Sequence, residues 1–265
     1  MLEKTINFIN KIRENRIASK LQPTEMKHND IYLVEYPKSG ITYLCHLLAH
    51  IEHFKKNNLE INFFNIHSFI PDIHQSKNIS DIKGQYIRAR MIKSHASYTS
   101  SYRYVIHLVR DPLDVMISYK NYLNDHWGLN ISFSKLIRSW RGIPRWIRHT
   151  DSWINSDINQ KYIPVHFKLL LSHPDKVLKY IYKSYGIYLP DDTIKSAIEA
   201  SSLENMLAAE RLWNYGYREK FANARFVGKK NFILEDVSNN DKEYILKNTN
   251  TLNVELLSMC ETYLK

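Results

Sequence analysis

The chain has 265 residues, a formal net charge of +10 from 37 Lys plus Arg against 27 Asp plus Glu, and two cysteines. Its length suffices for one α/β domain with a substantial core, and no linker rich in Pro, Gly or Ser divides it. The composition excludes a disulfide framework and a cysteine-based metal site, and no apolar run is long enough to span a bilayer.

We expect a single domain over residues 1–265, made of a basic helix at 1–28, a core at 31–236 and a helical segment at 237–265. Lysines and arginines interrupt the apolar residues of 1–21, so this stretch holds no uninterrupted apolar signal region. The two cysteines form no pairing pattern, which favours a reducing, cytoplasmic setting.

The first predicted strand leads through a loop into a helix. Residues 31–36 are short and β-rich, and residues 42–51 carry apolar side chains at helical spacing. Between them lies YPKSGITYL, residues 36–44, which places a lysine and several small residues at a helix N-terminus. Unpaired N–H groups at such an end face a bound anion, so this loop is predicted to hold a phosphate.

Four residues of the loop suit that role. Gly40 lets the backbone come close to a ligand, Ser39 and Thr42 offer hydroxyls, and Lys38 supplies a mobile positive charge. The order differs from the nucleotide-triphosphate loop, G-x-x-x-x-G-K-[ST], because here the lysine precedes the only glycine.

A second strand is expected over 86–92, with Lys93 and His95 directly after it. Open α/β sheets bind ligands at the carboxyl ends of their strands. A neutral imidazole can take a proton near pH 7, which makes His95 a candidate general base. The ordinary alternatives stay open, namely a non-catalytic histidine and an exposed lysine at a strand end.

The segment YVIHLVRDPLDVMISY, residues 104–119, predicts another strand, turn and helix. Their expected bounds are 105–109 for the strand, 111–112 for the turn and 114–122 for the helix. The forked guanidinium of Arg110 suits a terminal phosphate, and Ser118, two helical turns on, faces the same side. The alternative is a surface ion pair between Arg110 and Asp111 or Asp114.

These segments together resemble the sulfotransferases that use 3′-phosphoadenosine 5′-phosphosulfate (PAPS). The loop is similar to the family's YPKSGTTWL, residues 104–119 are similar to LVRDPRDVxxSxY, and Lys93-Ser94-His95 matches its K-x-H. The resemblance implies a single α/β domain of P-loop nucleotide-kinase-like architecture, with a central, mainly parallel sheet flanked by helices. It also implies PAPS as the cofactor and no metal.

The resemblance further implies roles for five residues. His95 is the general base that takes the acceptor's proton, Lys38 neutralises charge on the leaving phosphate, and Lys93 is a further catalytic lysine. Arg110 and Ser118 bind the 3′-phosphate of the cofactor.

Weaker similarities imply further cofactor contacts. The residues concerned are Ile41, Tyr43, Phe167, Ser202, Met206, Arg225 and Gly228. Tyr43 replaces the family's tryptophan and offers a ring to adenine, while Ile41 replaces a threonine and keeps its N–H for a phosphate oxygen. Phe167 replaces the tyrosine of VxYEDL and so lacks its hydroxyl. Ordinary alternatives are a serine-led helix start with Met206 in the core and a solvated basic loop around Arg225.

A positive charge suits an enzyme that holds a polyanionic cofactor. No helix-turn-helix spacing, zinc finger or aromatic RNA-binding signature predicts a nucleic-acid partner. The acceptor is not identified by the sequence. Residues 136–148, LIRSWRGIPRWIR, suggest a carbohydrate or amphiphile and peripheral membrane contact, against the favoured alternative of a core-facing helix with arginines outside.

Two other functions stay open. A nucleotide kinase uses the same architecture but needs a glycine-lysine-serine/threonine loop and a carboxylate for magnesium at a strand end. A non-catalytic protein that binds membranes or nucleic acid through its basic faces is the second.

Overall fold

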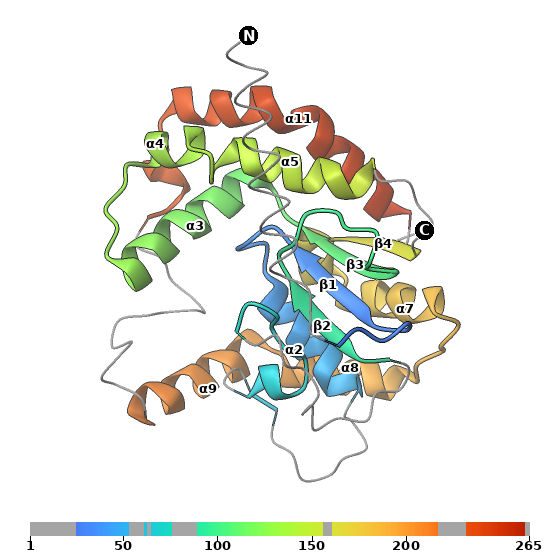
Figure 1. Ribbon diagram of the computed structural model, residues 1–265. Coiled ribbons are helices and arrows are strands. Elements are labelled where there is room, and N and C mark those ends of the chain that lie inside the picture. The colour runs from blue at the N-terminus through green and yellow to red at the C-terminus, as the bar shows by residue number, and fades with distance from the viewer. Residues whose placement is uncertain are drawn as a thin grey trace.

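The computed structural model describes residues 25–52, 61–62, 65–75, 89–155, 161–216 and 232–262. Four strands form one sheet in the order β2 (Met91–Ser94), β1 (Ile31–Glu35), β3 (Tyr104–Val109) and β4 (Lys161–His166), and every neighbouring pair is parallel (Figure 1). Parallel strands bring their carboxyl ends to one edge, so the segments that follow β1, β2 and β3 meet there. The predicted parallel α/β sheet is confirmed.

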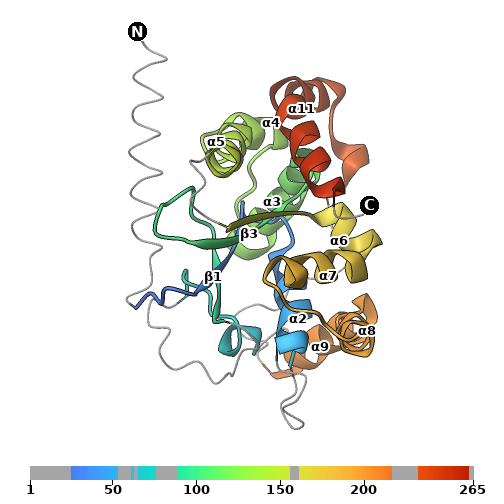
Figure 2. The ribbon, with the colours of Figure 1, turned by 90° about the vertical axis from the view of Figure 1, so that its right-hand side faces the viewer.

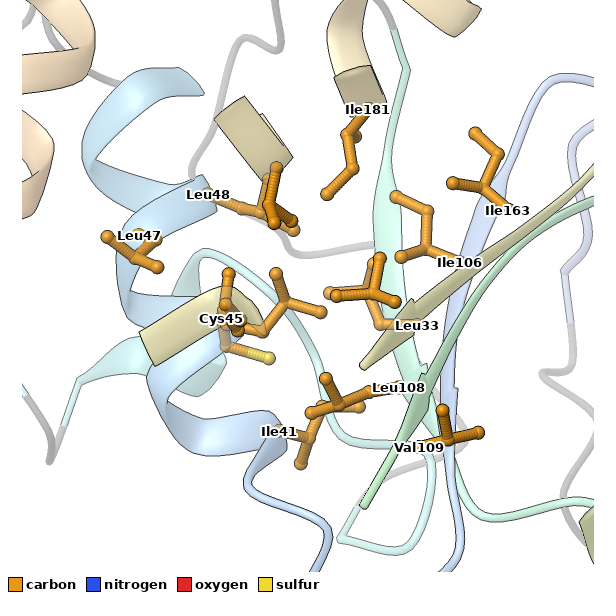
Figure 3. Close-up of a cluster of buried hydrophobic side chains, with 14 of the residues drawn as sticks. Leu33, Ile41, Cys45, Leu47, Leu48, Ile106, Leu108, Val109, Ile163 and Ile181 are labelled. Atoms are coloured by element: carbon orange, nitrogen blue, oxygen red, sulfur yellow. The ribbon is translucent and has the colours of Figure 1, made fainter. Parts of the chain in front are cut away.

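Alternation along β1 divides the core between the two faces of the sheet. Leu33 belongs to a large cluster that includes Ile106 of β3 and residues of the first helix, α2 (Ile41–Glu52) (Figure 3). Tyr32 and Val34 belong to a second cluster behind the sheet. A strand buried on both faces reads as the continuous apolar run seen in this sequence.

Helices cover both faces, as a doubly covered parallel sheet requires. Figure 2 shows α2, α7 (Pro174–Ser184) and α8 (Asp191–Ala200) on one side of the strands, and α5 (Ile143–Ile154) and α11 (Asn239–Glu261) on the other. The remaining described helices are α3 (Pro112–Trp127), α4 (Phe133–Arg138), α6 (Phe167–Ser172), α9 (Leu203–Gly216) and two short 3₁₀ turns, Ile66–Ser68 and Leu234–Asp236.

Several predicted boundaries differ from the structure by a few residues, and the differences at the start of α3 and in β2 are the most informative. Helix α3 begins at Pro112 rather than at residue 114, because Asp111 is its N-cap and accepts the N–H groups of Leu113 and Asp114. Proline is well suited to that first helical position. Strand β2 begins at Met91 and includes Lys93, which was expected to follow the strand; residues 86–88 lie outside the described ranges.

The basic tryptophan segment 136–148 is not one helix. Helices α4 and α5 are separated by residues 139–142, and a Cβ on Gly142 would lie 2.2 Å from the carbonyl oxygen of Leu136. Trp146 is buried, as the favoured interpretation expected. Arg145 is also buried, at 9% exposure, so the arginines do not all face solvent.

No helix in the described part of the chain combines the length and hydropathy needed to cross a membrane.

Candidate active site at the carboxyl edge of the sheet

The loop after β1 adopts a conformation that few residues tolerate. Lys38 has φ 79° and Gly40 has φ 104°, both in the left-handed region. A non-glycine residue held there is strained, and such strain clusters at functional sites. The Ser39 hydroxyl donates to the carbonyl oxygen of Tyr36 at 2.8 Å, which closes the loop on itself.

Gly40 is required by a close packing contact. A Cβ at this position would lie 2.3 Å from Cε2 of Phe167, the first residue of α6. The sequence predicts Gly40 as a point of close approach to a ligand, and in the structure the close neighbour is this aromatic ring. Phe167 therefore packs directly against the phosphate loop.

Two loop groups that the sequence assigned to the cofactor are used inside the protein. The Ile41 N–H, expected to face a phosphate oxygen, donates to Oε2 of Glu35 at 3.0 Å. The single hydroxyl hydrogen of Ser39 is directed to Tyr36, so in this conformation it is not offered to an anion. The backbone conformation at these two positions is fixed from within.

The side chain of Lys38 reaches from the loop to α3. Its ammonium lies 4.5 Å from the ring centroid of Tyr122 on α3. Burial lowers the pKa of Lys38, the nearby Glu35 opposes that shift, and the positive charges of Lys93 and Arg110 add to it. Lys38 and Arg110 are therefore close enough for their charges to interact.

Arg110 follows β3 and lies over the same ring that packs on the loop. Its guanidinium carbon is 4.9 Å from the centroid of Phe167, and a terminal nitrogen is 3.6 Å from the carboxylate of Asp114. The ion-pair alternative is therefore confirmed for Asp114, whereas Asp111 caps α3. Arg110 Nε is buried and has no hydrogen-bond partner among the described residues. A buried, unpaired guanidinium N–H is a donor suited to an anionic ligand.

The orientation of His95 follows from its hydrogen bond. Nδ1 lies 3.3 Å from the backbone carbonyl oxygen of Glu35, which can only accept, so Nδ1 carries the hydrogen. Nε2 is then the unprotonated nitrogen that can take a proton. Burial lowers the pKa of His95 well below its ordinary 6.5, with smaller contributions from Lys93 and His74. The ring is therefore neutral at pH 7, as a general base must be.

Lys93 is not an exposed lysine at a strand end. Its ammonium is 2.8 Å from Oδ2 of Asp72, and the two side chains are 12% and 5% exposed. The other oxygen of Asp72 accepts the N–H of His74, whose ring centroid is 4.4 Å from that of His95. Asp72 therefore places a paired lysine and a second imidazole beside the candidate base.

Most of the other predicted cofactor contacts lie on, or directly before, described helices. Ser118 is buried on α3, while Thr42 and Tyr43 are half-buried in the first turn of α2. Ser202 accepts the N–H of Asn205 at 3.3 Å and Met206 is buried, so the serine-led helix start is confirmed. Arg225 and Gly228 lie outside the described residues.

Sequence reasoning missed three residues of this site: Glu35, Asp72 and His74. Glu35 had a visible signal, because it is a lone acid that ends the apolar strand IYLVE directly before the loop. Asp72 and His74 lie in the segment IPDIH, which carries no motif, and their role appears only where Asp72 bridges to Lys93 of β2.

The loop at a helix N-terminus follows β1, and the strands on either side of β1 are followed by Arg110 and His95; this arrangement defines a P-loop-like α/β protein. The chain belongs to the sulfotransferase family, because the model of the sulfotransferase domain matches residues 28–251. No curated protein sequence matches the chain.

Solved structures show the same fold at low sequence identity. Mouse sulfotransferase SULT7A1, complexed with PAP, is 17% identical over 94% of each chain, with a TM-score of 0.59. Retinol dehydratase in complex with retinol and PAP is 16% identical over 96% of this chain and 86% of that chain, with a TM-score of 0.58. Its complex with androsterone and PAP is 14% identical over 95% and 85%, also with a TM-score of 0.58.

Proposed function

We propose that the chain transfers a sulfuryl group from PAPS to a hydroxyl or amine of an acceptor. One observation carries the proposal: Phe167 contacts both the phosphate loop at Gly40 and the guanidinium of Arg110, so the loop and the arginine both lie against one ring. A nucleotide with phosphates at both its 3′ and 5′ positions suits such a pair. Membership of the sulfotransferase family and the PAP complexes of the similar structures support this choice.

Each proposed anion site has a distinct task. Arg110 and Ser118 hold the 3′-phosphate, which selects PAPS over ordinary adenine nucleotides. Lys38 and the start of α2 hold the 5′-phosphate, where the lysine's charge stabilises the negative charge that grows on the leaving group. PAPS supplies the activated sulfuryl group. Fixed positions at both ends of the nucleotide orient the donor for in-line transfer.

His95 acts on the acceptor. Its Nε2 takes the proton from the attacking hydroxyl or amine while Nδ1–H stays bonded to the Glu35 carbonyl. Asp72 holds Lys93 close to His95. The role that we propose for Lys93 is therefore a positive charge at a fixed position, not a side chain that moves from one ligand to another.

Nucleotide titration tests the proposal directly. Binding of 3′-phosphoadenosine 5′-phosphate (PAP) and of ATP with magnesium would be measured by calorimetry on the whole chain. We expect PAP to bind at least about tenfold more tightly, because one charge-assisted contact to the 3′-phosphate contributes about 1.5 to 3 kcal/mol. A clear preference for ATP with magnesium would replace the proposal with a kinase.

Replacing Gly40 with alanine should weaken PAP binding by about tenfold or more, because the loop cannot keep its shape. The new Cβ meets the Phe167 ring at 2.3 Å, and φ 104° is strained for any side chain. Calorimetry with PAP and thermal unfolding of the same sample would separate lost binding from lost stability.

Gly128→Ala is the matched control. Gly128 also has a positive φ, 61°, but its Cβ would meet nothing within 4 Å. We expect Gly128→Ala to cost about 1 kcal/mol of stability and to leave PAP affinity unchanged. If both variants bound PAP like wild type, the contact between Gly40 and Phe167 would have no bearing on the nucleotide site.

The acceptor we propose is a small molecule that carries a hydroxyl group. The similar retinol dehydratase structures hold retinol or androsterone, both small alcohols, which supports this class. A panel of steroid, phenol, retinoid, sugar and glycolipid acceptors with donor labelled in the sulfate group would test it. Transfer only to sugars or glycolipids would favour the carbohydrate or amphiphile suggested by residues 136–148.

A further inference from the structure

The carboxylate of Glu35 lies where the phosphate loop and the candidate base meet. Glu35 ends β1 on the same alternating face as Leu33, and it is 3% exposed. One carboxylate oxygen accepts the Ile41 N–H at 3.0 Å, and the other is 3.7 Å from Nδ1 of His95. One side chain therefore touches both the first residue of α2 and the imidazole ring.

The backbone of the same residue completes the arrangement. The carbonyl oxygen of Glu35 accepts from Nδ1 of His95, so residue 35 faces that nitrogen with two oxygens. When Nε2 takes a proton the ring becomes a cation, and an anionic oxygen near Nδ1 stabilises it. The carboxylate thus lies on the side of the ring opposite to the nitrogen that reacts.

Two positive groups and two titratable groups that are neutral at pH 7 face this carboxylate. Lys38 approaches from the loop and Lys93 from β2, and each contributes to lowering the pKa of Glu35; His95 lies beyond the end of β2 and the thiol of Cys45 faces it from α2. Burial outweighs the lysines and raises the pKa of Glu35 to about 7. The group therefore changes charge close to neutral pH.

We infer that Glu35 is a positioning residue of the sulfotransferase site, whose carboxylate links the phosphate loop to the general base. The inference rests on the proposed function. Its ionised form stabilises the imidazolium of His95 during transfer. The same negative charge lies next to Lys38, where it opposes the 5′-phosphate of the nucleotide, so nucleotide binding favours the protonated carboxyl.

The two effects have opposite signs in Glu35→Gln, which keeps an acceptor for the Ile41 N–H but removes the charge. Transfer of labelled sulfate should fall by about tenfold or more at pH 8. PAP affinity should not fall and should exceed that of wild type by about fivefold at pH 8.5. A residue with only a structural role would lose transfer and PAP binding together.

The pH dependence gives a second readout. In wild type, PAP affinity should decrease by about fivefold from pH 7 to pH 8.5, because Glu35 ionises over that range and its negative charge opposes the phosphate. In Glu35→Gln this decrease should be absent, and any slope contributed by Lys38 or His95 is common to both proteins. Glu255→Gln, an exposed acid on α11, is the matched control and should behave as wild type.

Wild type alone provides a test if Glu35→Gln does not fold. Calorimetry at pH 7.5 in HEPES and in Tris, which differ in ionisation enthalpy, should show a fraction of a proton taken up when PAP binds. Three results would overturn this inference while leaving the proposed function intact. They are no proton uptake on PAP binding, an equal pH slope of PAP affinity in both proteins, and weaker PAP binding in Glu35→Gln. A wild-type chain that does not bind PAP would overturn the proposed function as well.

Discussion

Replacing His95 with alanine should lower sulfate transfer by about a hundredfold or more while PAP affinity stays within about twofold of wild type. General base catalysis by a positioned side chain contributes about 100-fold to 10 000-fold. His95 is not one of the proposed phosphate ligands, and its Nδ1 is committed to the Glu35 carbonyl. Removing the ring therefore takes away the proton acceptor and leaves Lys38 and Arg110 in place.

Transfer of labelled sulfate and calorimetry with PAP, made on the same preparation, would measure the two quantities. His28→Ala is the control, because His28 is exposed and lies before β1. Unchanged transfer in His95→Ala would remove His95 from its role. Lost PAP binding would instead make His95 a support of the nucleotide site.

The two phosphate segments could be predicted because each is continuous in sequence. Strand, turn and helix follow one another in residues 31–51 and again in 104–122, and the apolar pattern marks each element. The parallel order of β1 and β3 then brings Lys38 and Arg110 to the same edge. Local sequence was enough for this part of the site.

Contacts between distant segments could not be predicted in this way. Glu35 touches His95 across the pairing of β1 with β2, and Asp72 meets Lys93 through a parallel bridge outside any predicted element. Nothing in the residues around Lys93 indicates that its charge is paired. The contact with Asp72 buries Lys93, for which the sequence left open an exposed position at a strand end.

The loop itself shows a second kind of limit. Its residues predict hydroxyl and N–H donors, but the sequence does not say which of these the protein satisfies internally. Ser39 and Ile41 donate to Tyr36 and Glu35, so they shape the loop. Donor counts from a motif therefore overestimate the groups that remain for a ligand.

Replacing Arg110 with alanine should weaken PAP binding by about a hundredfold or more. Hydrogen bonds to a charged group contribute about 1.5 to 3 kcal/mol each when the partner is left unsatisfied, and the fork of arginine makes two. Adenosine 5′-phosphate, which lacks the 3′-phosphate, should lose much less affinity. The preference of the protein for PAP over adenosine 5′-phosphate should therefore nearly disappear in this variant.

Arg110→Lys and Arg103→Ala sharpen the comparison. Lysine keeps the charge but loses the fork and the planar contact with Phe167, so we expect an intermediate loss of PAP affinity. Arg103 is exposed at the opposite end of β3, so Arg103→Ala removes a positive charge of the same kind at a distance from the site and should leave PAP binding unchanged. Equal losses for PAP and adenosine 5′-phosphate in Arg110→Ala would mean that Arg110 acts on the whole nucleotide rather than on the 3′-phosphate, because only a contact with that phosphate discriminates between the two ligands.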